Sequence, residues 1–447
     1  MHDVHAFLFA LTVVLCVAAV TTVLCQRLHQ PVVLGYILAG LLVGPHVPTP
    51  LVADADIVRT LSEVGVILLM FSLGLEFSLR KLMRVGATAA LTAVVETSLM
   101  MWLGFTVTQF LGWTTMESLF AGAIVAISST TIVAKAFHEQ RVTGRLRETV
   151  VGVLIVEDLI AILLLATLTA IATGSGLEPG PLASTVGRLV AFLAGLVALG
   201  LLLVPRAVRV VKRLNRAETT IVASVGLCFA LALLAQWYGY SVALGAFIAG
   251  SLIAESGEER HVERLVEPVR DIFAAVFFVS VGMLIDPALI AQHWPAVAAL
   301  TAVVLLGKVV GVSLGSFLTG NRLRTSIQSG MSLAQIGEFS FIIAGLGLSL
   351  QATDSFLYPV AIAISAVTTL TTPWLIRASG PVASWVDRSL PRPLQTFTVL
   401  YGSWVEGLRN APRVESTTAQ IRRLLRRLLL DAALCAAIVV GGLRAGR

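Results

Sequence analysis

Residues 151–168 read VGVLIVEDLIAILLLATL, and this stretch decides the fold class of the chain. Apart from Glu157 and Asp158 it is apolar on every side, and about 20 apolar residues in a helix span the hydrocarbon core of a bilayer. Of all 447 residues, 57% are hydrophobic and only 13% are charged, whereas soluble domains carry about 25% charged residues. This composition excludes a soluble enzyme, a secreted disulfide scaffold, a fibrous protein and a disordered chain. The sequence therefore predicts an all-α polytopic membrane protein.

Charged and Pro- or Gly-rich breaks divide the chain into about thirteen apolar segments of membrane-spanning character. We expect helices, because a lipid-facing barrel needs short segments of alternating polarity. The predicted spans are residues 4–25, 31–45, 58–75, 86–111, 117–137, 149–172, 182–204, 219–236, 240–254, 271–285, 295–319, 326–350 and 355–376.

The distribution of basic residues supports this division and orients the chain. With the N-terminus outside, the predicted cytoplasmic connections hold 21 of the 32 Lys and Arg residues, whereas the opposite side holds only Arg59 and Arg188. We therefore expect a protein of the inner (cytoplasmic) cell membrane, with the end of the thirteenth helix inside. Because basic residues do not gather on one folded domain, no nucleic-acid partner is expected.

The C-terminal part differs in character from the rest. Pro381, Pro391 and Pro393 interrupt the helical pattern, and an Arg-rich tail follows. We expect a transmembrane domain at residues 1–378 and a basic tail at residues 379–447. The apolar stretch 424–443 in this tail predicts either a fourteenth span or an interfacial helix.

Few ionisable residues lie inside the predicted spans, where each costs at least about 2.5 kcal/mol unless it is paired or hydrated. Glu157 and Asp158 lie in the sixth span and Lys308 lies in the eleventh. Adjacent helical positions point about 100° apart, so we expect Glu157 to face Lys308 and Asp158 to face a pathway through the membrane. The alternative is a structural cluster in which Lys308 neutralises the pair or the carboxyls stay neutral. Glu96 and Glu338, in the fourth and twelfth spans, serve either structure or function.

Two predicted spans carry polar residues at their centres. They are AIVAISSTTIVAKAF (123–137), with Ser128, Ser129, Thr130 and Thr131, and SIQSGMSLAQIGEFSFIIAGLG (326–347), with Gln335, Gly337 and Glu338. Hydroxyl side chains compete for backbone hydrogen bonds, so we expect both helices to be broken there and their freed carbonyls and hydroxyls to ligate a cation. Packing through small residues is the alternative, but it does not explain four consecutive polar residues. These are the fifth and twelfth spans, and an odd offset of seven predicts entry from opposite sides, as in an inverted repeat.

These residues and their surroundings resemble the monovalent cation:proton antiporter-2 family, especially its Kef-type potassium/proton members. The similar stretches are QPVVLGYILAGLLVGP (30–45), EVGVILLMFSLGLEFSLRKL (63–82), AISSTTIVAKAF (126–137), GVLIVEDLIAI (152–162), ALGAFIAGSLIAES (243–256), EPVRDIFAAVFFVSVGMLIDP (267–287) and AQIGEFSFIIAG (334–345). The resemblance implies an NhaA-like fold of inverted repeats with two discontinuous crossing helices. It also implies a homodimer, in which a scaffold part holds the partner and a core part carries the ion.

The resemblance also implies roles for individual residues. Asp158 would be the ion-carrying carboxylate, Thr130 and Thr131 would lie at the helix crossing, and Lys308 would be the lysine of the eleventh span. Glu157 departs from the pattern, because Kef-type proteins usually have Gln there and electrogenic sodium exchangers have Asp. Kef-type proteins also usually carry a C-terminal nucleotide-binding regulatory domain, so a regulatory domain or subunit outside this chain is an expected partner.

The expected function is secondary transport, not enzymatic catalysis. A monovalent cation, K⁺ or Na⁺, would exchange for H⁺ by alternating access, with both ions competing for Asp158. Candidate cation ligands are Asp158, Ser129, Thr130 and Thr131, with Glu157 and Lys308 beside them and Gln335 and Glu338 as further candidates. Cys and His residues lack metal-ligand spacing, so no cofactor is expected. The alternatives are a gated cation channel and a transport-inactive membrane sensor that signals through its tail.

Overall fold

The computed structural model describes most of the chain. The described residues are 4–27, 32–47, 51–52, 55–77, 79–173, 216–256 and 259–391, scattered positions between 187 and 211, and Pro393, Gln395 and Tyr401. The stretch 424–443 and most of the predicted tail lie outside these residues. The division at residue 378 therefore stays a prediction.

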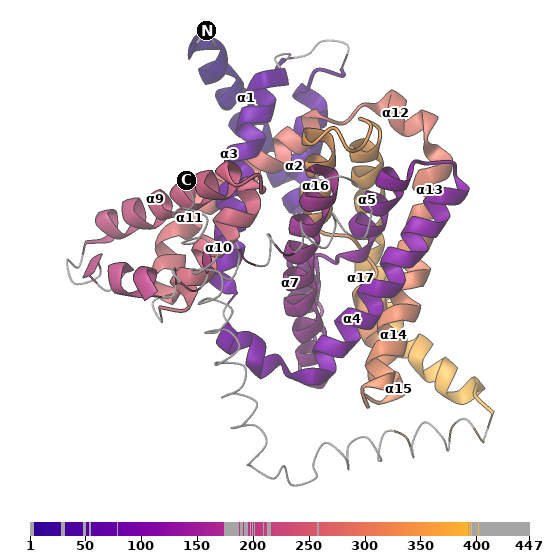
Figure 1. Cartoon of the computed structure of the whole chain (residues 1–447). Helices are drawn as coiled ribbons and strands as arrows, with labels where there is room; N and C mark the ends of the chain where they lie inside the picture. The colour runs from indigo at the N-terminus through magenta and orange to yellow at the C-terminus, as the bar shows by residue number, and fades with distance from the viewer. Residues whose placement is uncertain are drawn as a thin grey trace.

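All regular structure in the described residues is helical, which confirms the predicted fold class (Figure 1). The helices are α1 (Val4–Arg27), α2 (Val32–Val43), α3 (Ala55–Glu76), α4 (Leu79–Phe110), α5 (Thr115–Ala126), α6 (Thr130–Glu139), α7 (Arg145–Thr173), α9 (Ala217–Trp237), α10 (Val242–Ala254), α11 (Glu259–Met283), α12 (Pro287–Gln292), α13 (Trp294–Ala302), a π-helical turn η1 (Val303–Gly307), α14 (Lys308–Leu318), α15 (Leu323–Ser332), α16 (Glu338–Ser349) and α17 (Leu357–Ser389).

Among the described residues, seven helical stretches are long and apolar enough to cross a membrane. Shorter apolar helices, such as α2, α10 and α16, lie among them. Every predicted span except residues 182–204 corresponds to a helix or to consecutive helices. Residues 182–204 lie mostly outside the described part, so the total of thirteen stays a prediction. The chain is a multi-pass membrane protein.

Three helices differ from the sequence-based expectation in detail. α4 begins seven residues before the predicted span and bends at Gly86, which has a positive φ of 82°. The eleventh span contains the π-helical turn η1 directly before Lys308, and such turns are frequent at functional sites. α17 continues through Pro373 and Pro381 to Ser389, so the expected break at Pro381 was wrong. Membrane helices tolerate internal proline because neighbouring groups satisfy the freed carbonyls.

The helices pack in two groups, which Figure 1 shows side by side. α1, α2, α3, α9, α10 and α11 form one group, and α4 to α7 with α13 to α17 form the other. Glycines allow the closest approaches inside the first group. A Cβ atom on Gly250 of α10 would lie 2.1 Å from the Phe71 carbonyl oxygen of α3, and one on Gly40 of α2 would lie 2.0 Å from the Val279 carbonyl oxygen of α11. Small residues at such contacts are typical of membrane helix pairs.

We therefore expect Gly250→Ala to destabilise the first helix group. The new methyl group would overlap backbone atoms that cannot rotate away, and overpacking of this kind costs about 1–3 kcal/mol. Gly226→Ala on α9 is the matched control, because a Cβ atom there meets nothing within 4 Å. Thermal unfolding of the detergent-solubilised protein should show a lower midpoint for the first variant only. Equal midpoints for the two variants would contradict the α3–α10 packing.

Two helices of the second group are broken at the predicted places. α5 and α6 are separated by residues 127–129, and α15 and α16 by residues 333–337. α5, the first half of one broken helix, packs beside α16, the second half of the other (Figure 1). This pairing is expected when the two helices enter the membrane from opposite sides, as the odd offset in the sequence predicts. The breaks define the place where polar residues gather.

Candidate ion-binding site

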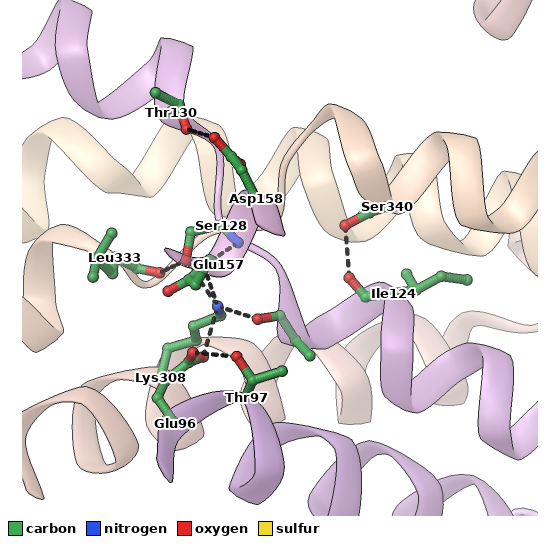
Figure 2. A network of polar contacts seen from close by, with 11 residues as sticks. Glu96, Thr97, Ile124, Ser128, Thr130, Glu157, Asp158, Lys308, Leu333 and Ser340 are labelled. Atoms are coloured by element: carbon green, nitrogen blue, oxygen red, sulfur yellow. Dashed lines mark hydrogen bonds and ion pairs between the residues drawn. The ribbon is translucent and has the colours of Figure 1, made fainter. Parts of the chain in front are cut away.

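The two broken helices cross in direct backbone contact. The Gly337 amide donates a hydrogen bond to the Ile127 carbonyl at 3.1 Å, and a Cβ atom on Gly337 would lie 2.7 Å from the Ser128 carbonyl oxygen. Only glycine fits this approach. Two hydroxyls add cross-links, from Ser128 to the Leu333 carbonyl at 3.1 Å and from Ser340 to the Ile124 carbonyl at 2.6 Å (Figure 2).

Each broken end carries a partial charge, and nearby charged side chains have the complementary sign. Helix N-termini are partially positive and C-termini are partially negative. The Lys308 ammonium donates to the carbonyl of Ala126, the last residue of α5, at 2.6 Å. Glu338 is the first residue of α16, and Asp158 accepts a hydrogen bond from Thr130, the first residue of α6. The crossing is therefore an electrostatically organised site.

Lys308 lies at the centre of a sealed polar cluster. Its Nζ atom is 2.7 Å from Glu96 Oε1, 2.8 Å from Ser128 Oγ and 3.4 Å from Glu157 Oε2 (Figure 2). Lys308, Glu96 and Glu157 are each 0% exposed. The predicted contact between Glu157 and Lys308 is present, but Glu96 of α4 is the closer carboxylate. The sequence alone did not predict a partner for Glu96.

Glu157 also supports the backbone of the first break. Its Oε2 atom accepts a hydrogen bond from the Ser128 amide at 2.8 Å. This amide lies in the extended segment between α5 and α6, so it makes no helical hydrogen bond to a carbonyl four residues earlier. In the described residues, the other carboxylate oxygen of Glu157 has no hydrogen-bond partner. Glu157 thus ties the extended segment to both α7 and Lys308.

Asp158 points away from the lysine cluster, as the helical geometry predicts (Figure 2). Its Oδ2 atom accepts a hydrogen bond from Thr130 Oγ1 at 3.2 Å. Asp158 is partly exposed, whereas Glu157 is fully buried. Thr130 is the one hydrogen-bond donor to Asp158 within the described part of the chain. The aspartate therefore retains capacity to bind an ion.

A further carboxylate lies close to the same hydroxyl run. Glu338, which is 8% exposed, accepts hydrogen bonds from Ser129 Oγ at 3.1 Å and from Thr131 Oγ1 at 3.3 Å. Gln335 lies elsewhere in the break, where its Oε1 atom accepts from Thr372 Oγ1 of α17 at 3.4 Å. The structure thus brings the hydroxyls of 129–131 together with Asp158 and Glu338, whereas Gln335 contacts α17.

The site has two layers with different chemistry. The inner layer around Lys308 is closed, and it balances buried charge. The outer layer contains carboxylate and hydroxyl oxygens and the unwound backbone at a membrane crossing, which is the type of site that coordinates Na⁺ or H⁺ in inverted-repeat transporters. A hydroxyl has one proton and two acceptor lone pairs, so each of these hydroxyls can serve a carboxylate and a cation together.

The chain is similar in sequence to known ion exchangers and antiporters. A family model described as "Sodium/hydrogen exchanger, transmembrane" matches residues 11–377. YbaL of Escherichia coli is 35% identical over 363 residues, which are 78% of this chain and 64% of that protein. The chain thus spans less than two thirds of YbaL. The Na(+)/H(+)-K(+) antiporter GerN of Bacillus cereus is 30% identical over 376 residues, which are 83% of this chain and 95% of GerN.

Solved structures support the same fold. The sodium proton antiporter MjNhaP1 from Methanocaldococcus jannaschii superposes with a TM-score of 0.67 at 16% sequence identity. The match covers 84% of this chain and 97% of that protein. At this identity the likeness concerns the fold alone.

Proposed function

Because the chain belongs to the sodium/hydrogen exchanger family, we propose that it exchanges a monovalent cation for H⁺ across a membrane. The resemblance to the monovalent cation:proton antiporter-2 family and its Kef-type members is confirmed by this match, since K(+) efflux antiporters are also among the relatives. The exchange is secondary transport by alternating access. Its proposed substrates are K⁺ or Na⁺, since the similar protein GerN is named as an antiporter of both ions.

The observation that carries the proposal is the accessibility of Asp158 at the helix crossing. Glu96 and Glu157 contact Lys308 and are sealed, whereas Asp158 is partly exposed and is held by one hydroxyl. A carboxylate in this position binds either a proton or a cation. Competition for one group couples the two fluxes, because Asp158 releases one ion when it takes the other.

Several finer assignments belong to the same proposal. Ser129, Thr130 and Thr131 complete the cation ligands, and Lys308 with its carboxylates holds the break in place. The second helix group, which carries the site, is the moving core, and the first group is the scaffold of a homodimer. We also propose that the protein lies in the cell's inner membrane with its N-terminus outside. A regulatory domain or subunit outside this chain is its proposed partner.

The test is exchange by purified protein in liposomes under an imposed pH gradient. We expect K⁺ or Na⁺ to dequench an internal pH dye, with an apparent KM for the cation that rises as the pH falls. Competition for a single site predicts a change of up to about tenfold per pH unit. Cation flux without proton movement would indicate a channel, and absence of any flux would indicate a sensor. Either result would refute the proposal.

A further inference from the structure

We propose that Glu338 is a positioning residue for the cation: it takes the protons of the Ser129 and Thr131 hydroxyls and leaves their oxygen lone pairs for the ion. This inference rests on the proposed exchange function. Glu338 belongs to the second broken helix, which provides no residue to the hydrogen bond between Thr130 and Asp158.

The hydrogen bonds of Glu338 are divided between two hydroxyls of one short run. Oε2 accepts from Ser129 at 3.1 Å, and Oε1 accepts from Thr131 at 3.3 Å. Thr130 lies between them and donates to Asp158. The three consecutive hydroxyls thus give their only protons to carboxylates. Ser129 also accepts the Ile132 amide at 3.3 Å, and one lone pair remains on its oxygen.

The direction of these protons matters for a cation. A hydroxyl binds a positive ion through its oxygen, so a proton that turns toward the ion would repel it. A carboxylate accepts hydrogen bonds only, and Glu338 therefore fixes the direction of both protons. Glutamine in its place would offer an NH₂ donor to one hydroxyl oxygen and occupy a lone pair that the ion needs.

Glu338 differs from the neutral cross-links of the same crossing. Ser340, two residues further along α16, donates its only proton to the Ile124 carbonyl at 2.6 Å. It holds the two broken helices together without orienting any ligand. Glu338 lies at the positive N-terminus of α16, where a carboxylate is favoured. Ser340 therefore cross-links the two broken helices, whereas Glu338 orients the hydroxyl ligands of the cation.

The first experiment measures cation-driven proton movement for Glu338→Gln, with Glu218→Gln, the same change at an exposed residue of α9, as the matched control. We expect the apparent KM for the cation to rise about tenfold in Glu338→Gln, which is typical for the loss of hydrogen bonds to a charged group. Its maximal rate should stay within about twofold, and Glu218→Gln should keep the wild-type KM. A wild-type KM in Glu338→Gln would overturn the inference. Absence of exchange in the wild-type protein would refute the proposed function instead.

The second experiment asks whether Glu338 acts through the hydroxyls. We expect Ser129→Ala/Thr131→Ala to raise the KM, and the addition of Glu338→Gln to change it no further. If Glu338→Gln does not fold, the variant Ser129→Ala/Thr131→Ala still tests these hydrogen bonds, because it removes the two donors and keeps the acceptor Glu338. A further tenfold rise on adding Glu338→Gln would show that Glu338 contacts the ion directly, and positioning would be the wrong role.

Discussion

Asp158→Asn is expected to abolish exchange completely, to the level of protein-free liposomes, while the protein still folds. Asparagine has nearly the shape of aspartate and keeps an oxygen that accepts the Thr130 hydroxyl. It has no negative charge for a cation and no carboxylate to take up a proton. Both fluxes should therefore stop together. The measurement is dequenching of a pH dye on addition of K⁺ or Na⁺ under an imposed pH gradient.

Asp387→Asn is the matched control for this variant. Asp387 is an exposed residue near the end of α17, far along the chain from the crossing. The same chemical change there should leave the KM and the maximal rate at wild-type values. Unfolding is monitored separately by the thermal midpoint, which Asp158→Asn should leave unchanged or raised, since it removes a charge from the membrane interior. Exchange by Asp158→Asn at the wild-type rate would exclude competition at this carboxylate.

Much of the fold follows from local sequence because the membrane imposes simple rules. Long apolar runs form helices, since every backbone group must be satisfied within the segment. The two breaks were also predicted, because Ser128 to Thr131 and the run around Gly337 compete with helical hydrogen bonds. The helix break expected at Pro381 is absent, because a proline in a membrane helix such as α17 does not end the helix as it would in a soluble protein. Sequence alone gives no sign of the π-helical turn before Lys308.

The candidate site was harder to predict, because it depends on contacts between distant segments. The 100° step between Glu157 and Asp158 predicted the contact of Glu157 with Lys308, which is present, and a different direction for Asp158. That Asp158 faces a pathway through the membrane stays a prediction. The step did not reveal that Glu96 would reach Lys308 more closely than Glu157 does, at 2.7 Å against 3.4 Å. Which carboxylate lies nearer to Lys308 depends on how closely α4 and α14 approach each other. Gly315 of α14 allows a close approach, since a Cβ atom there would lie 3.1 Å from the Thr92 carbonyl oxygen of α4.

The Lys308 cluster makes the second strong prediction, which concerns non-additive stability. Glu96→Gln and Glu157→Gln are each expected to leave one carboxylate beside the lysine and therefore to fold with a modestly lower thermal midpoint. The double variant Glu96→Gln/Glu157→Gln leaves a buried ammonium group without a counter-charge. Breaking a buried ion pair in this way costs about 3–5 kcal/mol. We expect loss of folded protein on size-exclusion chromatography, far beyond the sum of the single effects.

Removal of the lysine charge provides the control, because it separates charge balance from packing. Adding Lys308→Met to the double variant removes the uncompensated charge and keeps a side chain of similar length, so the triple variant should again yield folded protein. Buried ion clusters replaced by apolar groups of similar volume often fold well. If Glu96→Gln alone were as damaging as the double variant, Glu157 would not serve as a counter-ion. In that case its hydrogen bond to the Ser128 amide would be its main contribution, and the position would tolerate glutamine without loss of stability.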